Sequence, residues 1–104
     1  MTSTEVAAAN SINEVVNEPA DAEGCFDLGM VYSAGAGVPV DMVEAHKWFN
    51  IAAMRGHHDA ARLRREIAEQ MADAEIGCAQ RAARDWLKSH PQMLEPVAHI
   101  RAAA

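Results

Sequence analysis

The chain has 104 residues and a formal net charge of −6, and half of its residues are hydrophobic. This length holds one small domain and excludes two domains of ordinary size. Because 22 of the hydrophobic residues are alanine, the core is expected to be shallow. The alanine content, together with only four prolines, favours helices throughout and predicts an all-α protein.

The charges are distributed unevenly along the chain. Residues 1–46 contain eight acidic side chains and no Lys or Arg, whereas residues 47–104 contain seven acidic and nine basic side chains, so the halves carry −8 and +2. The acidic half opposes binding to phosphates, and the later bases are interleaved with acids. We therefore predict no nucleic-acid partner.

The start of the chain has neither the basic segment nor the continuous apolar run of a secretory signal. No later segment approaches the roughly 20 apolar residues of a membrane span. These features predict a cytoplasmic protein without membrane insertion. Cys25 and Cys78 are then expected to be buried or idle thiols, and the alternative, for an exported protein, is a disulfide between the first and last helices.

The N-terminal segment and the first helix differ in composition. Residues 1–18 are rich in Ala, Asn, Ser, Thr and Glu with few apolar anchors, which predicts a flexible acidic tail. Pro19 is expected in the first turn of a helix that runs to about Ala34, since the missing N–H of proline costs nothing there. The inner face of this helix would carry Cys25, Leu28, Gly29 and Tyr32.

A glycine-containing loop precedes the second helix. Gly35 and Gly37 permit the left-handed backbone that ends a helix and reverses the chain. Asp41, followed three residues later by Glu44, resembles a capping box at the start of the next helix, which runs until Gly56. The two helices would form an antiparallel hairpin. The inner face of the second helix carries Met42, Ala45, Trp48, Phe49, Ala52 and Ala53.

Two further amphipathic helices follow. The third is expected to begin within 57–59, and the fourth to run from Asp73 to about Ser89 after a bend near Ala72, with Asp73 as the N-cap. Pro91 and Pro96 would end the helical region. The apolar faces carry Ala60, Leu63, Ile67 and Met71 in the third helix and Ile76, Ala79, Ala83 and Trp86 in the fourth.

The hairpin carries small and aromatic residues at a fixed spacing: Leu28, Gly29, Tyr32, Gly35, Gly37, Val38, Asp41, Ala45, Trp48, Ala52, Ala53 and Gly56. Together they resemble the signature of the Sel-one-like repeat, a relative of the tetratricopeptide repeat. In physical terms, Gly29 and Ala45 would let the two helices approach closely, and Trp48 would be a core residue rather than a binding platform.

The resemblance implies a short α/α solenoid with a closing helix. Residues 56–63 resemble the opening of a second repeat, but Arg64 and Arg65 then replace the Leu-Gly pair, and 71–86 is similar to the closing helix of some bacterial members. The predicted divisions are a repeat domain (19–90) made of a full repeat (20–55), a partial repeat (56–71) and a closing helix (73–89), followed by a C-terminal tail (91–104).

The sequence shows no motif for catalysis. It lacks HExxH, CxxC, GxSxG and phosphate-binding loops, so we predict no enzymatic activity, no cofactor and no metal site. His57 and His58 are neighbours whose side chains would diverge by about 100° on a helix, which favours surface histidines. An alternative, a metal- or redox-responsive regulator, requires these histidines or Cys25 and Cys78 to converge.

The family resemblance implies protein–protein interaction, with the first helix lining the ligand-facing surface. Phe26, Asp27, Met30 and Val31 face away from the predicted core and form the candidate partner-binding surface, although Phe26 and Met30 could instead pack on the N-terminal tail. We predict a non-catalytic adaptor or regulatory subunit whose protein partner the sequence does not identify. The alternative is a self-assembling homo-oligomer, because one and a half repeats leave faces uncovered.

Overall fold

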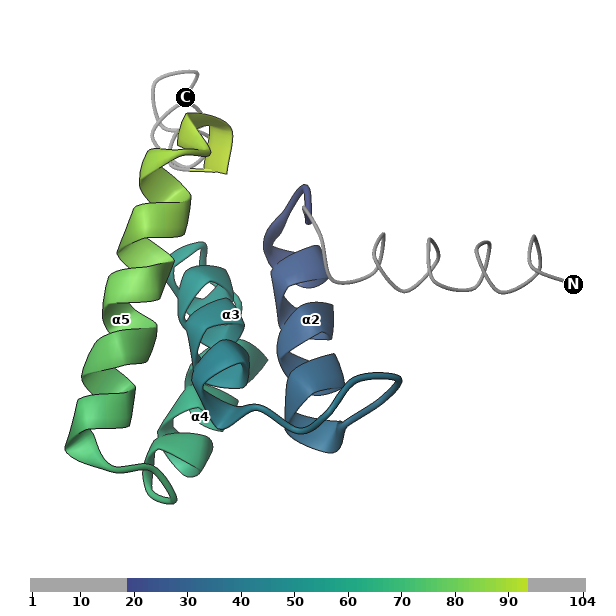
Figure 1. Cartoon of the computed structure of the whole chain (residues 1–104). Helices are drawn as coiled ribbons and strands as arrows, with labels where there is room; N and C mark the ends of the chain where they lie inside the picture. The colour runs from purple at the N-terminus through teal and green to yellow at the C-terminus, as the bar shows by residue number, and fades with distance from the viewer. Residues whose placement is uncertain (1–18, 94–104) are drawn as a thin grey trace, which may run out of the picture.

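The computed structural model describes residues 19–93, which form four α-helices and one 3-10 turn. The predicted tails, 1–18 and most of 91–104, lie outside the described residues. Helix α3 is central and packs against α2, α4 and α5 (Figure 1). The element bounds are α2 (Ala22–Ala34), α3 (Met42–Met54), α4 (His58–Ala68), α5 (Asp73–Lys88) and η1 (Pro91–Met93). The all-α prediction is confirmed.

Side chains before the first two helices fix where those helices begin. Asp21 Oδ1 accepts a hydrogen bond from the Gly24 N–H at 2.8 Å, so α2 begins after Asp21 and the prediction that Pro19 lies in its first turn is wrong. Asp41 Oδ1 accepts from the Glu44 N–H at 3.1 Å, as predicted. The second bond of the predicted capping box does not form, because the Asp41 N–H donates to the Tyr32 carbonyl instead.

The chain reverses between α2 and α3 through left-handed glycines. Gly35 (φ 73°) ends α2, and its N–H donates to the Val31 carbonyl at 2.9 Å. Gly37 has φ 83°. Both conformations are unfavourable for residues with a Cβ, so the predicted role of these glycines in the turn is confirmed.

Helix α5 begins without a side-chain cap. Ala72, not Asp73, is the N-cap residue, so that detail of the prediction is wrong. Alanine has no acceptor for the free N–H groups of the first turn. The Ala72 N–H itself donates to Glu75 Oε1 at 2.8 Å, so half of a capping box is present.

The core lies around α3, where α2, α4 and α5 pack against it. Gly29 sits against the Phe49 ring, where an added Cβ would approach two ring carbons to 2.4 Å. On the other side of α3, the rings of Trp48 and Trp86 meet edge to face with centroids 5.1 Å apart. The closing helix therefore covers one side of the hairpin, as expected. The buried apolar side chains of the core are Cys25, Leu28, Ala45, Trp48, Phe49, Ile51, Ala52, Ala60, Ile67, Ala83, Leu87 and Met93.

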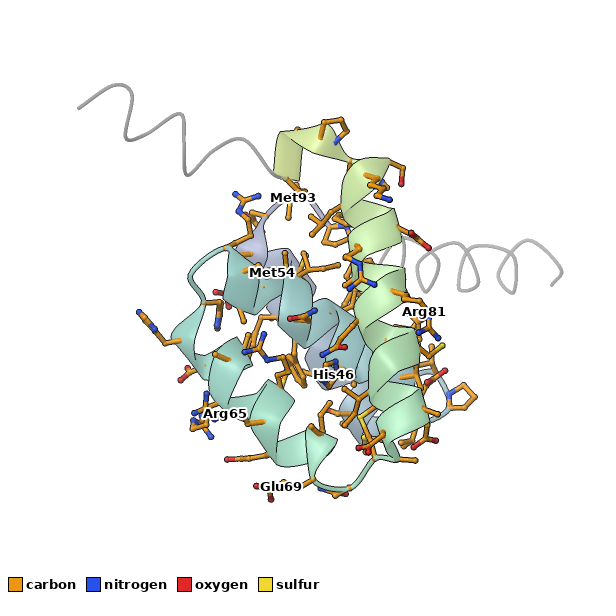
Figure 2. The ribbon with its side chains drawn as sticks, turned by 90° about the vertical axis from the view of Figure 1, so that its left-hand side faces the viewer. His46, Met54, Arg65, Glu69, Arg81 and Met93 are labelled. Atoms are coloured by element: carbon orange, nitrogen blue, oxygen red, sulfur yellow. The ribbon has the colours of Figure 1, made fainter. Side chains whose placement is uncertain are left out.

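Met93 closes the core at one end of the bundle. Its side chain is buried, and its carbonyl accepts a hydrogen bond from Arg55 Nη1. Figure 2 shows Met93 at the same end of the molecule as Met54, which is exposed. The turn at 91–93 thus ties the end of α5 to the end of α3. Across residues 19–93, no helix has the length and apolar character needed to cross a membrane.

Candidate protein-binding surface

Helix α2 packs on α3 with one side and leaves the other side exposed. Its exposed side chains recur at spacings of four, three and four residues, which places them on a single stripe of the helix. We call this stripe the α2 face, and it consists of Glu23, Asp27, Met30 and Ala34. Met30 is 42% exposed. Two residues of the predicted contact surface, Asp27 and Met30, therefore lie together on one accessible face.

The other two predicted contact residues are less accessible. Phe26 is partly buried, so the expectation that it is exposed is wrong. Its ring stacks on the imidazole of His57 with centroids 4.2 Å apart and planes 16° apart, and it lies 5.8 Å from the Phe49 ring. Val31 is also partly buried. Phe26 thus packs at the edge of the α2 face. The alternative, that Phe26 packs on the N-terminal tail, concerns residues outside the described range.

His57 connects the first hairpin to α4. Its Nδ1 accepts a hydrogen bond from the Ala60 N–H at 3.1 Å, which makes it the N-cap of α4. Because Nδ1 accepts, the ring hydrogen lies on Nε2, which donates to Glu23 Oε1 at 3.2 Å. The structure therefore gives His57 a structural role that the surface-histidine prediction missed, although His58 is exposed as expected. The sequence signal for this role was the position of His57 directly before a helix.

A polar cluster fixes Trp48 within the hairpin. Its indole N–H donates to Glu44 Oε1 at 3.1 Å, and Lys47 Nζ lies 4.3 Å from the centroid of its ring. Trp48 is only 4% exposed, so its prediction as a core residue is confirmed. Burial, followed by the charges of Glu44 and Asp41, raises the pKa of the nearby Tyr32. The Glu44 carboxylate is thus engaged in a hydrogen bond within the hairpin.

His46 is the buried polar side chain of the core. It is 3% exposed, and its Nδ1 has no hydrogen-bond partner among residues 19–93. Figure 2 shows it on α3 between the ribbons of α4 and α5. Burial and then the positive charge of Arg64 lower its pKa below the usual 6.5. His46 is therefore a neutral core residue. Its burial could not be predicted from the sequence, because it depends on how α4 and α5 cover α3.

The residues of the metal or redox alternative do not converge. Both cysteines are free, with Cys25 buried in α2 and Cys78 exposed on α5, so the disulfide alternative is not realised. Burial raises the pKa of the Cys25 thiol to about 12, which leaves it protonated at neutral pH. Within 19–93, no three His, Cys, Asp or Glu side chains gather as a set that could hold a metal ion.

The hairpin has the spacing of small and aromatic residues of a known repeat family. Residues 22–57 match the Sel1 repeat, also called the Sel-one-like repeat. Residues 22–57 are a Sel1 repeat. Repeats of this family form helical hairpins similar to tetratricopeptide repeats, typically mediate protein–protein interactions and are generally non-catalytic. No curated protein and no solved structure matches this chain.

Within the Sel1 repeat, the residues of the signature lie where the fold needs them. Leu28, Gly29, Ala45 and Ala52 are buried in α2 and α3, and Gly56 (φ 94°) follows the end of the hairpin. The matched segment ends at 57, and His57 is also the residue that joins the repeat to α4. The repeat therefore supplies the packed hairpin on which the α2 face is presented.

Proposed function

We propose that this chain is a non-catalytic protein–protein interaction adaptor or regulatory subunit that presents the α2 face to a protein partner. The observation that carries the proposal is the exposure of Met30, a large apolar side chain held on a rigid helix between Asp27 and Ala34. Methionine is enriched at protein interfaces, where it adapts to partners of varied shape. The usual role of Sel1 repeats in protein binding supports the same class of function.

The chemistry of the α2 face limits which partners would fit it. It carries the carboxylates of Glu23 and Asp27, and residues 1–46 contain no Lys or Arg. A partner surface with apolar and basic side chains would complement it, whereas an acidic surface would be repelled. Phe26, which is partly buried, would lie at the border of the contact.

The test is affinity capture from an extract of the native cell, followed by a binding measurement with the recovered protein in purified form. We expect Met30→Glu to abolish capture without loss of helix content. Met54→Glu is the matched control, because Met54 is 53% exposed but lies on α3, outside the α2 face. Equal recovery by the intact chain and the Met30→Glu variant would overturn the assignment of the face, and so would equal loss in both variants.

A further inference from the structure

Helix α5 carries a stripe whose charge is opposite to that of the α2 face. Arg81, Arg84 and Lys88 are exposed and face away from the buried side of α5, which carries Ala83 and Leu87. Gly77 continues the same stripe one turn earlier. We call Gly77, Arg81, Arg84 and Lys88 the α5 stripe. Asp85, also exposed, lies on its flank.

The bases of the α5 stripe are free of ion pairs within the part of the chain that the structure describes. None of Arg81, Arg84 and Lys88 forms an ion pair with another residue of the described range 19–93, and neither does Asp27 of the α2 face. Figure 2 shows Arg81 on the outer side of α5. The guanidinium group of Arg81 lies near Gly77, where an added Cβ would be 3.4 Å from its Nη1.

The two surfaces lie on helices that flank α3 on opposite sides (Figure 1). Helices α2 and α5 pack on different sides of α3 (Figure 1), so the α2 face cannot reach the α5 stripe of its own chain. Two different surfaces that complement each other form a head-to-tail contact between copies, unlike the identical patches of a two-fold dimer. A second copy of this chain therefore offers a complementary occupant for the α2 face.

The spacing of the two stripes also matches. The α2 face repeats at four, three and four residues, and the α5 stripe repeats at four, three and four residues. When the two helices run antiparallel, acidic residues of one stripe face basic residues of the other at one end, and small residues face each other at the opposite end. The facing pairs are then Glu23 with Lys88, Asp27 with Arg84, Met30 with Arg81, and Ala34 with Gly77.

We propose that the chain self-associates head to tail, with the α2 face of one copy docked antiparallel on the α5 stripe of the next. Met30 packs along the aliphatic part of Arg81, and Ala34 approaches Gly77 closely. Because exposed ion pairs are weak and screened by salt, the association is weak and declines as ionic strength rises. It also covers the face that the proposed function assigns to a protein partner, so self-association and partner binding compete.

The test is sedimentation equilibrium of the purified full-length chain over a range of protein and salt concentrations. We expect mass to rise with protein concentration at low salt and to fall toward the monomer at high salt. Asp27→Arg and Arg84→Glu should each weaken self-association by about tenfold or more, since each places like charges in the contact. Glu23 is left unchanged because its carboxylate contacts His57.

Mixing the two variants makes the test specific. The Arg84→Glu variant keeps an intact α2 face and the Asp27→Arg variant keeps an intact α5 stripe, while the two substituted side chains also complement each other. An equimolar mixture should therefore recover the association that is weakened in each variant alone. Arg65→Glu is the matched control: it makes the same charge change as Arg84→Glu at an exposed position of α4, outside both stripes, and should have little effect. Helix content by circular dichroism verifies that each variant is folded.

Three results would overturn the proposal: a wild-type chain that stays monomeric at low salt, a mixture that fails to associate, or an Arg65→Glu variant weakened as much as Arg84→Glu. Each of these is measured on the purified chain alone. The partner-binding proposal is decided separately by Met30→Glu and Met54→Glu in the capture experiment, so failure of one proposal does not imply failure of the other.

Discussion

The α2–α3 hairpin and the α4–α5 segment are both pairs of helices, but they are built differently. Small residues specify the hairpin, and the packing of Gly29 against Phe49 sets the distance between its helices. Helices α4 and α5 do not form a hairpin of this kind, because each packs on α3. The hairpin therefore follows from local sequence, whereas the second segment depends on the surface that the hairpin provides.

Glycine substitutions give the sharpest separation of the two regions. In Gly29→Ala the new Cβ would lie 2.4 Å from two carbons of Phe49, a ring that is only 1% exposed. We expect a loss of about 1–3 kcal/mol in the free energy of unfolding, despite the higher helix propensity of alanine. The measurement is urea denaturation followed by circular dichroism.

Gly77→Ala is the matched control on α5. Its Cβ would meet only Arg81 Nη1, at 3.4 Å, so the gain in helix propensity should dominate and stabilise the protein by up to about 1 kcal/mol. A loss of stability in Gly29→Ala together with a gain in Gly77→Ala would confirm that close approach between helices is a feature of the hairpin and not of α5. If both stabilised the protein, the tight contact between Gly29 and Phe49 would not govern the packing.

His57 joins the α2–α3 hairpin to the α4–α5 segment. His57→Ala removes the acceptor that caps α4 and the ring stacked on Phe26, and we expect a loss of about 1–2 kcal/mol. His58→Ala, at the exposed neighbouring position, should change stability by less than about 0.5 kcal/mol. Thermal and urea denaturation of both variants make the comparison, and equal effects would remove the special role of His57.

Helix α5 lacks the side-chain N-cap that α2 and α3 have, and a single substitution can introduce one. Ala72 has the extended conformation of an N-cap residue (φ −74°, ψ 154°), and Glu75 already accepts from its N–H. Ala72→Ser adds an acceptor for the Glu75 N–H and should stabilise the protein by about 1 kcal/mol. Ala74→Ser, inside the first turn, should instead be slightly destabilising because serine has lower helix propensity. An Ala72→Ser variant no more stable than the wild type would contradict this account of the cap.

The same contrast explains how much the sequence predicted. Glycines at 35 and 37, Asp41 and the apolar spacing are local signals, and they predicted the hairpin and the burial of Trp48. The partial burial of Phe26 was missed because it depends on His57, which reaches the ring from a distant part of the chain. The α2 face was predicted in part, through Asp27 and Met30. Glu23 and the α5 stripe could be assigned to surfaces only from the tertiary structure.

A pH-dependent effect is expected from His46, which lies where α4 and α5 cover α3 (Figure 2). Burial and Arg64 lower the pKa of His46 in the folded protein below the 6.5 of an unfolded chain. Below about pH 6.5 the unfolded chain therefore binds a proton that the folded protein does not, and stability falls as the pH falls. The slope from this one group is at most about 1.4 kcal/mol per pH unit and disappears below the folded pKa.

His46→Leu isolates this contribution, because the variant differs from the wild type only in lacking this one histidine. Urea denaturation between pH 5 and pH 8 should give a shallower pH dependence for the variant than for the wild type. Arg64→Gln should also flatten the wild-type slope, since it removes the second cause of the lowered pKa while burial remains. If the free energy of unfolding had the same pH dependence in the wild type and in His46→Leu, His46 would be accessible to protons in the folded protein. Helices α4 and α5 would then cover α3 less completely than α2 does.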